Sequence, residues 1–331
     1  MATYKEILGT AVQNFAADPS DPVTGQVWYN STTGQFKYKD ETSAGAWATG
    51  GNLNTARRLM GGAGVQTAAL AFGGSATPGD PFPTTNITES YNGSSWTELN
   101  DLNTARFFLS GAGTQTAALA IAGESGGGPL PNTVVGITES WNGTSWTEVN
   151  DLNTARSRAA AAGTVQTAAL YFGGWAPNFA QTESWNGTSW TEVNDLNTAR
   201  RSLTGVGTNT AALAIGGFTT VNVGVNESWN GTSWTEVNDL NTARSELAGA
   251  GASNTAALAF GGSPPITAIT EEWNGTSWTE VNDLNTARRG LGGRGTNTVA
   301  LAFGGDTTVP VASTEEWNAP FTRTEIITLT T

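Results

Sequence analysis

Acidic side chains recur at equivalent positions along this chain and are the first candidates for chemistry. Four identical copies of "TEVND" each place an aspartate three residues after a glutamate: Glu148, Glu192, Glu236 and Glu280 with Asp151, Asp195, Asp239 and Asp283. Two carboxyl groups can cleave a glycoside as acid and base, but they must then lie in unlike environments. Since equivalent repeats give like environments, we expect no enzymatic activity from them.

The absence of histidine and cysteine narrows the chemistry further, because the 331 residues contain neither. Imidazole bases, thiol nucleophiles, disulfides and ordinary zinc or copper sites are therefore excluded. Chemistry like that of galactose oxidase is excluded for the same reason. We expect no cofactor and no metal site. Calcium bound by the oxygen atoms of "NDLN" stays an alternative, although no loop of EF-hand spacing supports it.

Arginines recur as regularly as the carboxylates. One ends each copy of "LNTAR": Arg57, Arg106, Arg156, Arg200, Arg244 and Arg288. Each repeat also has one glutamate in the segment "TES", "NES" or "TEE": Glu89, Glu139, Glu183, Glu227, Glu271 and Glu315. The arginines could bind anions. The one-to-one ratio instead favours structural inter-blade ion pairs, since Arg–carboxylate forks fix the register of the units they join.

The elements that position these residues come from the repeat itself. Successive "LNTAR" arginines are 49, 50, 44, 44 and 44 residues apart, a period typical of solenoids, propellers and arrays. The third unit, residues 152–195, reads as four short strands: a small-residue stretch after Arg156, then "TAALYF", "TESW" and "SWTEV". Between the last two strands, Asn186-Gly187 predicts a type I′ hairpin turn.

Four strands per unit and six units predict an all-β fold, a six-bladed β-propeller. The units begin near Leu53, Leu102, Leu152, Leu196, Leu240 and Leu284. Their unequal lengths and irregular loops favour a natural array over a designed one. Glycine and alanine in the first strands let the strands crowd at the axis, while tryptophan fills the space between blades further out.

The last unit lacks a fourth strand. Trp47 lies ten residues before Arg57, which is the spacing of Trp146 and Arg156. We therefore predict that "GAWATG", around Trp47, closes the ring against residues 314–317. The alternative is closure by "TEIITL", residues 324–329. The predicted propeller domain is 45–331, and residues 1–44 form an N-terminal attachment segment.

The repeat resembles the Kelch family of propellers. Double glycines follow the second strand at Gly73-Gly74, Gly173-Gly174, Gly216-Gly217, Gly261-Gly262 and Gly304-Gly305. An aromatic residue precedes a tryptophan by five positions, as in Trp141/Trp146, and an arginine opens each unit. The chain departs from the pattern at Gly123, where "IAGE" replaces the double glycine, and in the last unit, which has no second tryptophan.

The N-terminal segment does not follow the repeat pattern. Residues 21–47, "DPVTGQVWYNSTTGQFKYKDETSAGAW", alternate in polarity on both sides of "NSTTG" and predict a short β-hairpin. The segment resembles short stretches of tailed-phage fibre and other virion proteins. The matching residues are Gly25, Gln26, Tyr29, Asn30, Thr32, Thr33, Gly34, Phe36, Trp47, Gly50 and Gly51. This resemblance implies that the segment mounts the protein on other virion proteins.

The loops after the second strands differ in every unit, and we expect them on the same face as the links between units. A rigid ring that displays divergent loops is a binding architecture. The aromatic candidates for a ligand site there are Phe82, Trp175, Phe179 and Phe218. Exposed, they could stack on sugar rings or anchor a protein partner; the alternative is that they pack onto the blades.

Charge and hydropathy limit the partners. A net charge of −13 argues against nucleic-acid binding. No apolar run approaches the roughly 20 residues of a membrane span, and we find no Sec signal at the N-terminus. We expect a non-enzymatic virion structural protein of a tailed phage, namely a fibre, decoration or receptor-binding component. It would be made in the host cytoplasm and bind a host-surface glycan or protein. A bacterial Kelch-like interaction or carbohydrate-binding module is the alternative, and either fits a monomer or an oligomer.

Overall fold

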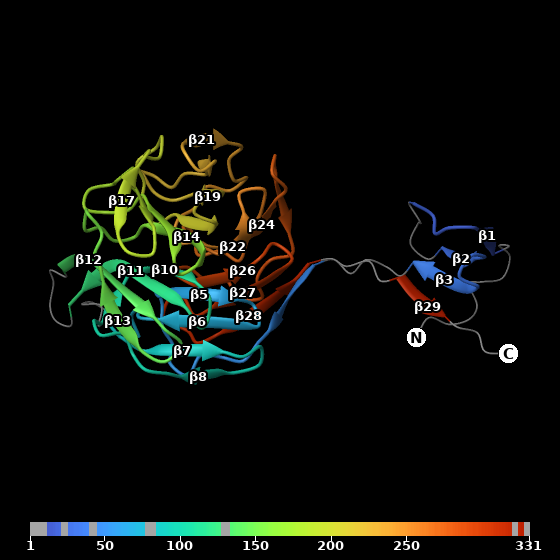
Figure 1. Ribbon diagram of the computed structural model, residues 1–331, viewed down its shortest axis with the longest axis horizontal. Coiled ribbons are helices and arrows are strands. Elements are labelled where there is room, and N and C mark those ends of the chain that lie inside the picture. Colours follow the sequence, from blue (N-terminus) through green and yellow to red (C-terminus); the bar gives the residue numbers. More distant parts are fainter. Residues whose placement is uncertain are drawn as a thin grey trace. The chain divides into compact units, whose positions relative to one another are not determined.

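The structure is a computed structural model that describes residues 12–20, 26–39, 45–76, 84–126, 133–319 and 324–327. All regular elements in these ranges are β-strands. None of the described residues belongs to a helix long and apolar enough to cross a membrane. The chain forms two compact units, which are treated separately below (Figure 1).

The larger unit, Ala46–Asn318, contains six antiparallel sheets with four strands along their main path. The first is β5 (Gly61–Val65), β6 (Ala68–Phe72), β7 (Thr88–Tyr91) and β8 (Trp96–Glu98). The second is β10 (Ser110–Gly113), β11 (Ala118–Ser125), β12 (Thr133–Trp141) and β13 (Trp146–Val149), with β9 (Arg106–Phe107) added beside β11. The third is β14 (Ala160–Val165), β15 (Ala168–Phe172), β16 (Thr182–Trp185) and β17 (Trp190–Val193).

The remaining three sheets repeat this order. The fourth is β18 (Thr204–Gly207), β19 (Ala212–Ile215), β20 (Asn226–Trp229) and β21 (Trp234–Val237). The fifth is β22 (Ala248–Ser253), β23 (Ala256–Phe260), β24 (Thr270–Trp273) and β25 (Trp278–Val281). The sixth is β26 (Gly292–Gly295), β27 (Val299–Phe303), β28 (Thr314–Asn318) and, from the start of the chain, β4 (Ala46–Thr49).

Small residues let the first strands of neighbouring sheets approach each other. These strands contact in a closed cycle, from β5 through β10, β14, β18, β22 and β26 back to β5. At Gly111 a Cβ atom would lie 2.2 Å from the carbonyl oxygen of Gly62 on the neighbouring strand. Since real Cβ atoms do not come so close, the glycine is required by the narrow axis. The arrangement is that of a β-propeller.

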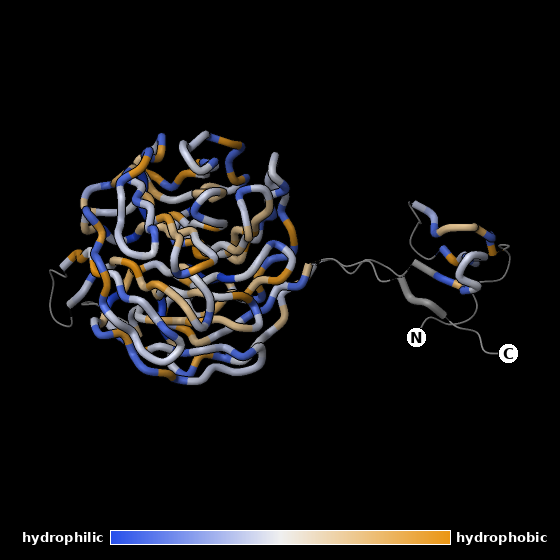
Figure 2. Tube along the Cα trace, viewed as in Figure 1, coloured by the Kyte–Doolittle hydropathy of each residue, from blue (hydrophilic) through white to orange (hydrophobic). Residues whose placement is uncertain are grey.

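Tryptophans from the third and fourth strands pack between sheets. Trp185 and Trp190 lie opposite each other on β16 and β17, with ring centroids 5.3 Å apart. Trp190 Nε1 donates to Thr138 Oγ1 of the preceding sheet at 3.1 Å. Both rings are buried in one cluster with Leu119 and Ile121 of that sheet. Figure 2 shows apolar segments inside this unit and polar segments along much of its outer edge.

The N-terminal strand closes the ring. Trp47 of β4 lies directly opposite Trp317 of β28 in an antiparallel pairing, and the two rings are 5.6 Å apart. The predicted N-terminal closure is thus confirmed. The alternative closure by residues 324–329 is wrong, because β29 (Thr324–Ile327) pairs with β3 (Gln35–Lys39) of the smaller unit.

The smaller unit is a four-stranded sheet in the order β1, β2, β3 and β29, with β1 at Gln13–Phe15 and β2 at Val27–Asn30. The predicted hairpin is its β2–β3 pair. Asp18 supports it by accepting from Lys37 Nζ at 2.6 Å and from Asn30 Nδ2 at 2.8 Å. The extension is therefore larger than a hairpin, and it includes β29, which the predicted boundaries put with the propeller at 45–331.

The hairpin between β16 and β17 differs from the predicted type I′ turn. Such a turn needs positive φ at both central residues, but at Asn186-Gly187 only Gly187 has one, at +93°. Asn186 instead uses its side chain, whose Oδ1 accepts from the N–H groups of Thr188 and Ser189 at 2.9 Å. The N–H of Asn186 donates to the carbonyl of Ser189. The two central residues of the turn are therefore Gly187 and Thr188, one position later than predicted.

Candidate binding site at the mouth of the channel

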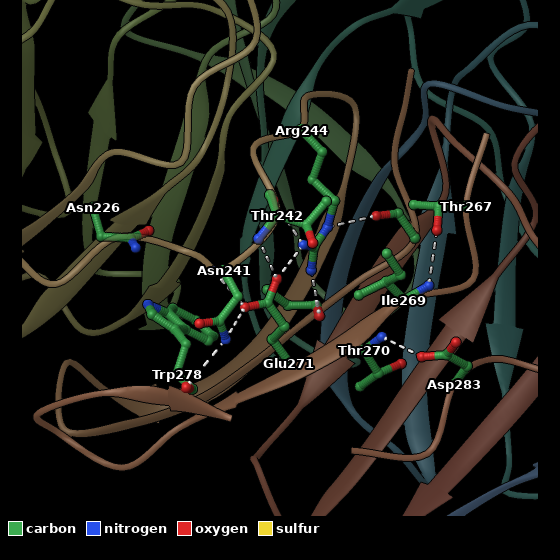
Figure 3. A network of polar contacts seen from close by, with 12 residues as sticks. Asn226, Asn241, Thr242, Arg244, Thr267, Ile269, Thr270, Glu271, Trp278 and Asp283 are labelled. Atoms are coloured by element: carbon green, nitrogen blue, oxygen red, sulfur yellow. Dashed lines mark hydrogen bonds and ion pairs between the residues drawn. The ribbon is translucent and has the colours of Figure 1, made fainter. Parts of the chain in front are cut away.

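The repeated arginines and glutamates lie together, buried, in every unit. In the fifth sheet Arg244 and Glu271 form an ion pair in which both side chains are at most 1% exposed (Figure 3). Arg244 also donates to the carbonyl oxygens of Gly261 and Ala259 at 3.0 and 3.1 Å. Glu271 accepts from the N–H and the amide of Asn241 at 2.7 and 2.8 Å. The pair is thus enclosed by hydrogen bonds within the protein.

The same pairing occurs in the other five units, between the end of the link and the third strand of the sheet that follows it. The ion pairs are Arg57–Glu89 at 3.1 Å, Arg106–Glu139 at 2.8 Å, Arg156–Glu183 and Arg200–Glu227 at 2.5 Å, and Arg288–Glu315 at 2.9 Å. Burial lowers the pKa of Arg57 to about 10, so the guanidinium stays charged at neutral pH. None of these arginines is exposed to a ligand.

The fourth-strand carboxylates also have structural neighbours. Asp195 Oδ1 accepts from the N–H of Thr182 at 3.1 Å, and Asp283 does the same for Thr270 at 2.9 Å. Glu192 lies opposite Glu183, the partner of the buried arginine. Within the described ranges no group of three or more acidic, histidine or cysteine side chains could hold a metal ion.

The six first strands line a central channel along the axis of the propeller. A ring of main-chain hydrogen bonds surrounds the axis at one end of this channel, which we call the mouth. It is formed by the second residue after each "LNTAR": Leu59, Phe108, Arg158, Ser202, Glu246 and Gly290. The N–H of each donates to the carbonyl oxygen of its counterpart in the preceding unit, and the six distances run from 2.7 to 3.2 Å. Since Leu59 donates to Gly290, the ring is closed.

The residues of this ring share an unusual backbone conformation. All six have φ between +52° and +57°, and five of them are not glycine. Non-glycine residues in the left-handed region cost about 1–3 kcal/mol each and occur often at functional sites. Here the closed set of hydrogen bonds holds them in place, so the main chain forms one rigid frame whose side chains vary.

The side chains around this frame differ from unit to unit and bridge neighbouring sheets. Arg158 Nε lies 3.3 Å from Glu124 Oε1, and its guanidinium stacks 3.9 Å from the centroid of Phe108. Arg289 lies 3.7 Å from Glu246. Arg58 forms an ion pair with Asp306 across two sheets. A hollow of about 110 Å³ lies among them, lined by Arg58, Leu59, Phe108, Arg158, Glu246, Arg289, Gly290 and Asp306.

Positive charge is concentrated at this mouth. Residues 46–318 contain eleven arginines and no lysine. Six are the buried partners described above, and the other five are Arg58, Arg158, Arg201, Arg289 and Arg294. The first four lie at the mouth and Arg294 lies inside the channel. Four of these five arginines thus lie around one opening, and three of them, Arg58, Arg158 and Arg289, are paired there with carboxylates.

Two of the predicted aromatic residues meet at the same face. Arg201 contacts both rings, and its guanidinium carbon lies 4.2 Å from the centroid of Trp175 and 4.6 Å from that of Phe218. Trp175 is 37% exposed. Arg201 also donates to Asn178 Oδ1 at 2.8 Å. Burial and the nearby charge of Arg158 lower the pKa of Arg201.

The other two predicted aromatic residues are less informative. Phe179 is partly buried, and its N–H donates to the Gly174 carbonyl at 2.9 Å. Phe82 lies outside the described residues. None of the six residues in the ring of main-chain hydrogen bonds is among the residues predicted to bind a ligand. Their signal was nevertheless present, since the two residues after each "LNTAR" read RL, FF, SR, RS, SE and RG directly after near-identical copies.

Comparison with known proteins supports the fold alone. No family model matches the sequence, and no curated protein matches it. Solved structures do match, among them that of YjhT, whose fold is β-propeller-like. That match has a TM-score of 0.68 and 10% sequence identity, and it covers 82% of this chain and 99% of YjhT.

Proposed function

We propose that this chain is a six-bladed, Kelch-like β-propeller without enzymatic activity, which belongs to the virion of a tailed phage. In this proposal the mouth face binds a glycan or protein of the host surface. The small sheet attaches the propeller to other virion proteins. The six-blade count is supported by the closed cycle of six first strands and by the closed ring of six hydrogen bonds.

The binding proposal rests on one observation: the side chains differ most where the main chain is most regular. The main chain at the mouth repeats six times with nearly equal φ angles, yet its side chains are Leu, Phe, Arg, Ser, Glu and Gly. An aromatic–cationic stack lies beside them at Arg201. Arginine and aromatic side chains dominate binding energy at interfaces, so this face has the composition of a binding surface.

The setting in a virion rests on the resemblance of residues 21–47 to phage proteins. The pairing of β29 with β3 supports a mounting role, because it makes the segment a folded sheet rather than a loose tail. A bacterial Kelch-like interaction or carbohydrate-binding module remains the second candidate. Purified virions distinguish the two: we expect this polypeptide among their proteins by mass spectrometry, and its absence would refute the virion assignment.

The binding face can be tested with the full chain on arrays of host-surface glycans and on whole host cells. Replacing Arg201 with alanine removes the centre of the stack, and we expect at least about a tenfold loss of binding. Thr188→Ala is the matched control, because Thr188 is exposed on a hairpin turn at the opposite face. An unchanged binding profile for Arg201→Ala would contradict the proposal.

A further inference from the structure

The interior of the channel contains one charged side chain that breaks the repeat. Arg294 of β26 lines two cavities, one of about 120 Å³ toward the mouth and one of about 350 Å³ toward the opposite end. The equivalent residues, six positions after each "LNTAR" arginine, are Ala63, Ala112, Ala162, Val206 and Ala250. Each of these six positions lies opposite a leucine on the second strand. One unit thus carries a cation where the others are apolar.

Arg294 binds main-chain oxygens but no carboxylate. Its Nη2 donates to the carbonyl of Gly62 and, at 2.9 Å, to that of Gly111, while Nη1 donates to Gly293 at 3.0 Å. Its Nε has no acceptor among the described residues. No ion pair within the described ranges includes this guanidinium, and burial alone lowers its pKa to about 10.

Arg294 differs from the six paired arginines, because they are at most 1% exposed whereas Arg294 is partly exposed. All six of those have a glutamate in contact, as expected because an enclosed charge is costly without an opposite one. Arg294 is still charged at neutral pH, since its pKa is far above 7. No described side chain of the propeller supplies a counter-ion for it, so an anion that enters the cavity can pair with it.

The larger cavity has the size and walls for such a counter-ion. Its volume of about 350 Å³ is within the range of pockets that hold small organic ligands. Glycine, alanine and valine form most of its wall, Thr114, Thr116, Thr164 and Thr296 add hydroxyl groups, Gln115 adds an amide, and Arg294 is the one charged residue among those that line it. Apolar walls around a single cation suit an anion with an apolar body better than a strongly hydrated inorganic ion.

We propose that the channel is a binding site for a small monocarboxylate, whose carboxylate pairs with Arg294 and whose short apolar tail occupies the 350 Å³ cavity. This site is separate from the mouth face, and the proposal does not rest on the proposed function. A chain that fails to bind host surfaces can still bind a carboxylate, and the reverse also holds.

The test is calorimetric titration of the full chain with butyrate, with its neutral analogue butyramide, and with inorganic phosphate and chloride. We expect saturable binding of butyrate and at least about tenfold weaker binding of butyramide, because a hydrogen bond to a charged group contributes more than a neutral one. Arg294→Ala introduces the residue present in four of the other units, so it suits the fold. It should weaken butyrate binding about tenfold or more.

Arg289→Ala, at the mouth, is the control and should bind butyrate as the unchanged chain does. A melting experiment gives a second readout, since butyrate should raise the Tm of the unchanged chain but not that of Arg294→Ala. The proposal is overturned if no carboxylate binds saturably, if Arg294→Ala binds butyrate equally well, or if butyramide matches butyrate. Equal binding of phosphate or chloride would overturn the assignment to a carboxylate.

Discussion

Two buried polar atoms, one on Asn226 of the fourth sheet and one on Trp278 of the fifth, have no hydrogen-bond partner among the described residues. We therefore expect one substitution at this contact to stabilise the protein. In five sheets the third strand contains a threonine whose hydroxyl accepts from the tryptophan Nε1 of the next sheet, for example Thr182 from Trp234 at 3.0 Å. In the fourth sheet this position is Asn226. There, among the residues that the structure describes, the Nε1 of Trp278 has no acceptor and the Oδ1 of Asn226 has no donor, although both atoms are buried (Figure 3).

Asn226→Thr should therefore raise the free energy of unfolding. A buried donor without a partner costs about 1–3 kcal/mol, and the substitution removes that penalty for Trp278. It also removes the unpaired Oδ1. It loses the bond from Asn226 Nδ2 to the Asn238 carbonyl, 3.0 Å long, which is about 1 kcal/mol. The net gain is about 1 kcal/mol, or about 2–4 °C in Tm for a domain of this size.

The measurement is a pair of melting curves, together with hydrogen exchange of the Trp278 indole N–H. The matched control is the reverse change in the neighbouring sheet, Thr182→Asn, which should leave Trp234 unpaired and lower the Tm by a similar amount. A Tm for Asn226→Thr that is unchanged or lower, with indole exchange no slower than before, would refute the reasoning.

Three further predictions follow from the ion pairs, the closing strand and the small sheet. Glu271→Gln leaves the charge of Arg244 buried and unpaired, so denaturant unfolding should show a loss of about 3–5 kcal/mol. Removing residues 1–44 should leave the elution volume and the Tm of the propeller close to those expected for its intact fold. Removing residues 1–50 also deletes β4 and should lower the Tm and cause self-association by gel filtration, because the edge of β28 is then exposed. The pKa of Asp18 is lowered from 3.8 to about 2, first by the hydrogen bond from Lys37. The contribution of Asp18 to the stability of the small sheet is therefore present above pH 4 and lost as the pH falls through 2. An NMR titration should show this loss in the unchanged chain and not in Asp18→Asn.

Much of the propeller could be predicted from the sequence because each unit carries its own strand and turn signals. "TESW" and "TAALYF" match β16 and β15 within one residue. The orphan Trp47 predicted ring closure, since its spacing to Arg57 equals that of a complete unit. Here local pattern and global topology agree, as expected where identical packing recurs six times.

Other features depend on contacts that no local pattern encodes. The strand β29 pairs with β3 almost three hundred residues earlier in the chain, and nothing in "TEIITL" distinguishes that partner from the edge of β28. The left-handed backbone of Phe108 and Arg158 contradicts their conformational preference, and it is stabilised by the closed ring of hydrogen bonds. At Asn186 the backbone does not adopt the positive φ that the Asn-Gly pair predicts, and the side-chain oxygen stabilises the turn instead.

The copied and the variable residues together explain how one frame can present unlike side chains. The ion pair of Arg244 and Glu271 fixes the end of each link, and the next residues must then enter the first strand through the left-handed position. Main-chain hydrogen bonds hold that position in every unit, so its side chain can differ from unit to unit while the frame stays the same. A binding surface built in this way can diverge at six points while every blade keeps the same packing, which is the pattern that these sixteen-residue copies and their divergent successors display.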